Sequence, residues 1–200
     1  MSPAASVPGL STLLSWPTEH LTEAADHWEI VSGRSYEVAN RVWQDALSVD
    51  WRGEAADALR RATHADMLTT SAVADQLQES AKIARSGASD LYKARSRMRY
   101  AVEDARTAGF NVGEDLSIAD RMVGGSAAQR AARQAQAEAF ASDIRQRAAQ
   151  MLALDQEVAG KVTAAVAGIR DTFPQNPAPV STDNRVRAVD HTWKQDGGSG

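Results

Sequence analysis

The chain has 200 residues and a formal net charge of −4, and its 43% hydrophobic and 24% charged content is ordinary for a globular protein. It contains no cysteine, which excludes disulfide frameworks, zinc fingers, iron–sulfur clusters and thiol catalysis. Alanine accounts for 38 of the 200 residues, whereas aromatic residues make up only 6%. Because alanine has the highest helix propensity and is depleted in strands, the composition predicts an all-α chain. No apolar run approaches the roughly 18 residues of a membrane span, so we expect no transmembrane segment.

The beginning of the chain predicts a flexible N-terminus over residues 1–16, which holds two prolines and no helical periodicity. No basic residue precedes an apolar stretch there, so we expect no ordinary secretory signal peptide. Pro17 and Glu19 favour a helix start, and the helix is expected to run to about Ser48. Its apolar face recurs at helical spacing. The face consists of Leu21, Ala25, Trp28, Val31, Val38, Val42 and Ala46.

A second periodic run extends from Gly53 to about Ala108, interrupted by a single glycine, Gly87. A continuous helix of this length would be a rod of roughly 80 Å, which needs other helices alongside it. Gly109 is placed as the C-cap that ends it. The apolar positions are Ala55, Leu59, Ala62, Val73, Leu77, Ala84, Leu91, Met98, Val102 and Ala105.

The rest of the chain predicts a short turn or helix over residues 117–123, and then a third long helix capped by Ser126. Residues 171–200 are rich in proline and glycine, which is typical of a linker or disordered tail. The expected fold is therefore an elongated antiparallel bundle over residues 17–170, made of a helical hairpin and a third long helix. Alanine seams bury little area per residue, so such a bundle favours packing with a partner helical protein or self-association.

Two short motifs stand out. Trp51-Arg52-Gly53 lies between the first two helices, where glycine permits a sharp turn and an indole could pack over the hairpin end. A packed indole there would be worth about 2–4 kcal/mol; the alternative interpretation is an ordinary tight junction between two helices. Tyr100 and Asp104, four residues apart, share one face of the second helix. The alternative for this pair is a surface tyrosine beside a solvated acid.

Together these motifs resemble the Trp-x-Gly (WXG/ESX-like) family of helical hairpins exported by type VII secretion in actinobacteria, and the related PE/PPE-type N-terminal domains. The resemblance covers about residues 18–108. It implies that Trp51 and Gly53 form the hairpin motif, and that Tyr100 and Asp104 are the export signal read by the secretion ATPase or a chaperone. The longer second helix and the third helix look more like a larger secreted substrate, or a bundle heading a multidomain protein, than a minimal hairpin.

The sequence carries little that suggests catalysis, a cofactor or nucleic-acid binding. His20, His27 and Glu23 lie near one helix face, but their spacing is not that of a zinc motif, and we expect no metal site. The basic stretch from Lys93 to Arg99 spreads around the helix and has acidic neighbours. Residues 1–50 hold two basic and seven acidic side chains, so pairing of the basic stretch with the acidic first helix, or solvation, is favoured over nucleic-acid binding.

The sequence therefore predicts a non-enzymatic helical module that is targeted to type VII secretion and acts by packing with a partner. The expected location is secreted or at the cell surface, by a route that needs no signal peptide. One alternative is the N-terminal targeting domain of a larger effector, toxin or hydrolase whose catalytic domain lies beyond residue 200. A second alternative is a cytoplasmic structural bundle.

Overall fold

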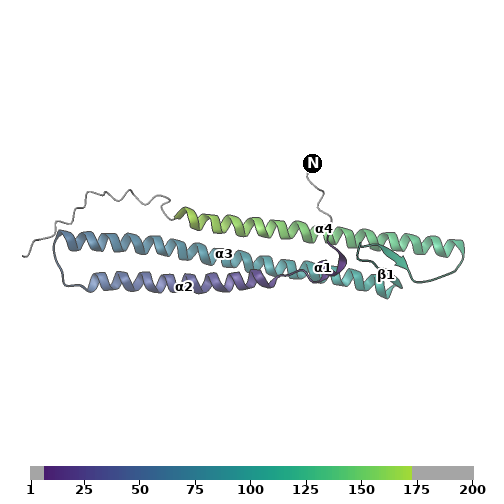
Figure 1. Cartoon of the computed structure of the whole chain (residues 1–200), viewed down its shortest axis with the longest axis horizontal. Helices are drawn as coiled ribbons and strands as arrows, with labels where there is room; N and C mark the ends of the chain where they lie inside the picture. The colour runs from purple at the N-terminus through teal and green to yellow at the C-terminus, as the bar shows by residue number, and fades with distance from the viewer. Residues whose placement is uncertain (1–6, 173–200) are drawn as a thin grey trace, which may run out of the picture.

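The computed structural model describes residues 7–172 and is an elongated bundle of helices (Figure 1). The elements in chain order are α1 (Leu10–Leu14), α2 (Glu19–Ser48), α3 (Glu54–Thr107), β1 (Phe110–Val112), β2 (Ile118–Asp120) and α4 (Ala127–Thr172). The all-α bundle with a hairpin and a third long helix is confirmed. The start of each long helix lies within about two residues of the position that the capping signals indicated.

Helix α3 is the central helix of the bundle, because both other long helices pack on it. Its 54 residues span about 80 Å. Figure 1 shows α3 running between α2 and α4. Gly109, with a φ of 91°, follows its C-terminus, as the glycine stop signal predicted. Near the C-terminus of α4, Gly168 faces Gln76. Helix α4 continues only four residues further, to Thr172, so about residues 54–71 of α3 extend past it and pack with α2 alone.

Small residues and cross-helix polar contacts join α2 to α3. Ala25, Ala74 and Ala81 are fully buried, so the two backbones approach closely. The buried hydroxyl of Ser32 donates a 2.8 Å hydrogen bond to the carbonyl oxygen of Ala74. At the surface, the Arg85 guanidinium contacts a carboxylate oxygen of Asp26 at 2.6 Å and one of Glu29 at 2.7 Å. These two carboxylates raise the pKa of Arg85.

The contact between α3 and α4 contains most of the large core side chains. Leu91 and Met98 of α3 pack in one cluster with Ile144 and Met151 of α4, and each is at most 1% exposed. The start of α4 has the predicted cap. The Gln129 backbone N–H donates to Ser126 Oγ at 3.2 Å, and the Ser126 N–H donates to Gln129 Oε1 at 2.8 Å. This reciprocal pair is a capping box, which satisfies two otherwise unpaired donors.

The prediction of a short turn or helix over residues 117–123 is wrong, because the chain forms a small antiparallel hairpin of β1 and β2 there. Its register pairs Phe110 with Asp120, Asn111 with Ala119 and Val112 with Ile118. Leu116 closes the turn with a φ of 62°, and the Ser117 N–H donates to Asp115 Oδ1 at 3.1 Å. Asp120 lies three residues after Ser117, at the spacing of a helical capping box, but it pairs with Arg133 of α4.

The prediction of a flexible N-terminus over residues 1–16 is also wrong for part of that range. Leu10 and Leu13 of α1 are 4% and 0% exposed in the core, and the Leu10 N–H donates to the Glu114 carbonyl at 3.0 Å. The Trp16 indole N–H donates to Asp155 Oδ1 of α4 at 3.0 Å. Apolar burial and these distant hydrogen-bond partners hold the segment in place. Residues 1–6 and 173–200 lie outside the described residues, including most of the predicted tail.

The basic stretch from Lys93 to Arg99 lies beside the end of α1, and the charge of Arg95 also acts on Glu19, the first residue of α2. Arg95 donates to the Trp16 carbonyl oxygen at 2.7 Å, and Arg99 donates to the Leu14 carbonyl oxygen at 2.9 Å. Lys93 pairs with Asp90 one turn earlier on α3, at 3.1 Å. Two of these cations therefore satisfy the carbonyls at the C-terminal end of α1, where a helix favours positive charge.

Candidate functional site

The predicted hairpin motif lies at the turn between α2 and α3. Gly53 has a φ of 114° and no neighbour within 4 Å of its missing side chain, so its conformation rather than lack of space requires glycine. Arg60 stabilises the turn, because its guanidinium donates to the carbonyl oxygens of Val49 and Trp51 at 3.2 and 3.0 Å. The Trp51 side chain is 48% exposed, so it does not form the packed cover that the sequence suggested.

We expect Trp51→Ala to lower the free energy of unfolding by about 1 kcal/mol or less, because truncating a half-exposed side chain forfeits little burial. Gly53→Ala should cost more, about 1–2 kcal/mol, because alanine is strained at positive φ. Urea denaturation followed by circular dichroism measures both. A loss above 2 kcal/mol for Trp51→Ala would contradict the exposed position of the indole.

The hairpin end exposes many large apolar side chains. Val38 and Val42 of α2 and Leu59 of α3, which periodicity placed on the apolar faces, are 62%, 49% and 44% exposed. Helix α4 does not reach this end of α3, so it leaves Leu59 uncovered, whereas Val38 and Val42 lie on α2, which packs on α3 and not on α4 (Figure 1). We refer to them and their neighbours as the hairpin-end apolar residues. The set comprises Val38, Val42, Leu47, Val49, Trp51, Leu59 and Leu68.

The second predicted pair, Tyr100 and Asp104, lies near the opposite end of α3, about 70 Å along the helix from the hairpin turn. Tyr100 is 71% exposed and Asp104 is also exposed. Within residues 7–172 neither side chain has a hydrogen bond or ion pair. The structure therefore keeps this pair on one open helix face but does not bring it together with Trp51 and Gly53.

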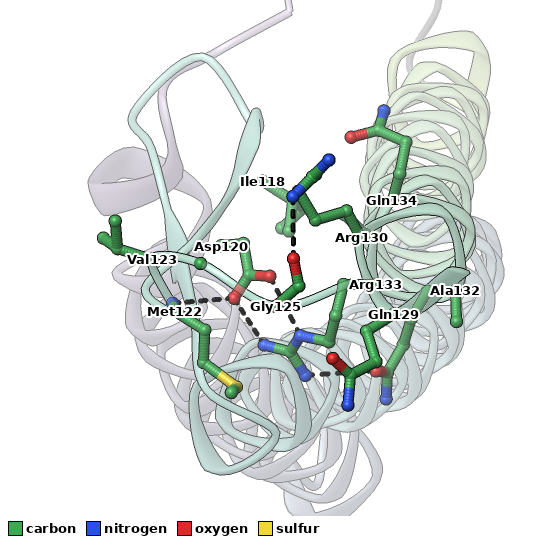
Figure 2. A pocket seen from close by; sticks show the side chains of 13 residues that line it. Ile118, Asp120, Met122, Val123, Gly125, Gln129, Arg130, Ala132, Arg133 and Gln134 are labelled. Carbon is green, nitrogen blue, oxygen red and sulfur yellow. Dashed lines mark hydrogen bonds and ion pairs between the residues drawn. The ribbon is translucent and has the colours of Figure 1, made fainter. Parts of the chain in front are cut away.

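A cluster that sequence reasoning missed joins the ends of α3, β2 and α4 around Arg133 (Figure 2). The Arg133 guanidinium contacts the Asp120 carboxylate at 2.6 and 2.9 Å and lies 3.9 Å from the ring centroid of buried Phe110. It also donates to the carbonyl oxygen of Ala108 at 2.9 Å. The hydrogen bonds from Arg133, then that from the Met122 N–H, lower the pKa of Asp120 to about 2. No local motif marks this cluster, since its members come from separate elements.

A hollow of about 600 Å³ opens beside this cluster, between β2, the loop over residues 121–125 and the first turns of α4 (Figure 2). The Arg133 charge on its wall is already matched by Asp120. Among residues 7–172, no three histidine, aspartate or glutamate side chains gather in a group that could hold a metal ion, and this includes His20, His27 and Glu23. The hollow is lined by polar side chains, among them Gln129, Arg130 and Gln134, and by Gly124 and Gly125.

The sequence is similar to uncharacterized mycobacterial proteins. It is 44% identical over 188 residues to Rv2077c of Mycobacterium tuberculosis and to Mb2102c of Mycobacterium bovis. The match covers 94% of this chain and 58% of each relative, so the chain spans little more than half of their length. No protein-family model and no solved structure matches the chain. None of the helices in residues 7–172 combines the length and apolar character needed to cross a bilayer.

Proposed function

We propose that this chain is a non-enzymatic helical module that is targeted to type VII secretion and acts by packing with a partner protein. The proposal rests on the exposure of the Tyr100 and Asp104 side chains. Both side chains are exposed on one face of α3, and within residues 7–172 neither makes a hydrogen bond, ion pair or ring contact. A phenol and a carboxylate presented together in this way form a surface that a receptor can read.

The hairpin end supports the partner-packing part of the proposal. Exposed large apolar side chains that gather at one end of a molecule are typical of protein interaction sites. Two antiparallel helices bury one seam between them, and the hairpin-end apolar residues lie where no further helix of the described chain covers them. A partner helical protein, or a second copy of the chain, would bury this surface. The mycobacterial relatives fit the actinobacterial setting of type VII secretion.

A second candidate is that the bundle targets or docks a larger protein whose chemistry lies in another domain. It is favoured by the length of the relatives, since the matched region is only 58% of each. In that case the bundle has the same role as proposed here, but its cargo is the remainder of the protein. A cytoplasmic structural bundle is the outcome if the export test below fails.

Tyr100→Ala and Asp104→Ala should each reduce export at least tenfold while leaving the thermal midpoint unchanged, because exposed side chains contribute little to folding. The measurement is the amount of tagged protein in the medium of an actinobacterial host, beside an isogenic strain that lacks the secretion ATPase. Tyr92→Ala and Glu103→Ala are matched controls, since both residues are exposed on the same stretch of α3.

The two controls should be exported normally. Normal export of both Tyr100→Ala and Asp104→Ala would overturn the secretion signal. Loss of export together with a collapsed thermal transition would show that these residues act in folding, and this would also contradict the proposal.

A further inference from the structure

The β-hairpin leaves one strand edge unpaired. Two hydrogen bonds determine which residue pairs of the hairpin are hydrogen-bonded. The Gly113 N–H donates to the Ser117 carbonyl oxygen at 2.8 Å, and the Arg121 N–H donates to the Gly109 carbonyl oxygen at 3.1 Å. In an antiparallel pair, hydrogen-bonded and non-hydrogen-bonded residue pairs alternate. The register then makes Asn111 and Ala119 a bonded pair and turns the peptide groups of Ile118 and Asp120 outward. These groups have no partner within the described residues.

A groove runs beside this free edge, along the first turns of α4. The 600 Å³ hollow near Met122 and a second hollow of about 440 Å³ near Ser142 share three lining residues, which are Ile118, Gln134 and Ala137. The two hollows are therefore adjacent, and we call them together the edge groove. Figure 2 shows Ile118 of β2 with Arg130 and Gln134 of α4 around its first half. An unpaired strand edge beside such a depression is a template for an added strand.

The charges at the two ends of the edge groove define what fits it. Arg130 lines the first hollow and Arg145 lines the second. Arg130 has no ion-pair partner within residues 7–172 and donates to the Gly125 carbonyl oxygen, at 2.7 Å. Arg145 makes no direct ion pair there, although its charge acts on the Asp115 carboxylate. The two residues are about 22 Å apart along α4, which corresponds to about seven residues of extended chain. Between them the groove is lined by the apolar side chains of Ile118, Ala137 and Ala141 and by polar side chains. The polar ones include Gln134 and Glu138, and the Glu138 carboxylate accepts a 2.9 Å hydrogen bond from Gln134.

We propose that the edge groove binds an extended acidic peptide segment of a partner protein, which adds to β2 as a third strand. Its backbone pairs with the outward peptide groups of Ile118 and Asp120, and small apolar side chains face Ala137 and Ala141. Carboxylates about seven residues apart pair with Arg130 and Arg145. This is strand addition, in which backbone hydrogen bonds give affinity and alternate side chains give specificity. The proposal is independent of the secretion role, since it uses neither Tyr100 nor the hairpin end.

The probe is a blocked synthetic heptapeptide, glutamate-serine-valine-threonine-valine-serine-glutamate, titrated into the isotopically labelled protein. We expect the Ile118 and Asp120 amides to shift and to gain at least tenfold protection from hydrogen exchange. The Ala119 amide, already bonded within the hairpin, should change little. Methylating the peptide nitrogens that face β2 should abolish binding, whereas methylating the alternate nitrogens should leave it intact. A peptide with lysine in place of both glutamates should bind at least tenfold more weakly.

Two protein variants locate the site. Gln134→Trp fills the middle of the edge groove from an exposed helix position and should weaken binding at least tenfold, whereas Gln150→Trp, exposed further along α4, should not. Absence of shifts at millimolar peptide, equal sensitivity to both methylation patterns, or shifts confined to the hairpin end would each overturn the proposal. Protection of Ile118 and Asp120 that rises with protein concentration alone would assign the edge to a second copy, and would also overturn it.

Discussion

Phe110→Ala should lower the free energy of unfolding by about 3–5 kcal/mol, the range for removing a fully buried aromatic side chain. Phe110 is 0% exposed. The centroid of its ring lies 5.6 Å from the ring centroid of Phe140 and 3.9 Å from the guanidinium carbon of Arg133. The ring therefore joins the hairpin to α4 from one side, while Asp120 holds the same guanidinium from the other. Urea denaturation followed by circular dichroism measures the loss.

Two control variants test whether the loss of stability comes from the buried packing of the Phe110 ring. Phe110→Leu retains most of the apolar volume but removes the aromatic face beneath Arg133, so we expect it to cost less than Phe110→Ala. Tyr100→Ala removes an exposed ring and should change stability by no more than about 0.5 kcal/mol. A loss below about 1 kcal/mol for Phe110→Ala would show that the hairpin does not stabilise the ends of α3 and α4.

The long helices could be predicted from sequence because their signals are local. Apolar spacing, the glycine stop at Gly109 and the cap at Ser126 act within a few residues, and each lies where it was expected. What periodicity could not show is which apolar positions would be covered. Val38 and Leu59 have the spacing of core residues, yet both are exposed. Helix α4 ends before it reaches Leu59, and Val38 lies on α2, which packs on α3 and not on α4. Coverage depends on the relative lengths and offsets of distant helices, which no local pattern encodes.

The two missed segments depend on distant partners. The α1 segment is too short for periodicity to be recognised, and its position depends on hydrogen bonds with Glu114 and Asp155, more than 100 residues away in sequence. The strands of the hairpin have only three residues each, too few for alternation to be recognised. The edge groove follows from that hairpin and from its position against α4, so it could be found only in three dimensions.

Gly87→Ala should destabilise the bundle by about 1–3 kcal/mol, although alanine in a helix interior normally stabilises by about 1 kcal/mol relative to glycine. A Cβ atom at position 87 would clash with the Cγ1 atom of Val158 and lie 3.0 Å from its Cγ2 atom. Valine on a helix has one strongly preferred rotamer, so it cannot easily turn away. The added methyl group must therefore push α3 and α4 apart. Thermal or urea denaturation of the purified variant gives the change.

A double-mutant cycle with Val158→Ala tests the cause. Val158 is buried, so the single change should itself cost stability. Combined with Gly87→Ala, however, it removes the clashing methyl groups, so the double variant should be more stable than the sum of the two losses predicts, by about 0.5–3 kcal/mol. Gly33→Ala is the matched control, because no atom lies within 4 Å of the added Cβ and the ordinary helical gain of about 1 kcal/mol should appear. Strict additivity of Gly87→Ala and Val158→Ala would refute close approach of α3 and α4 at this position.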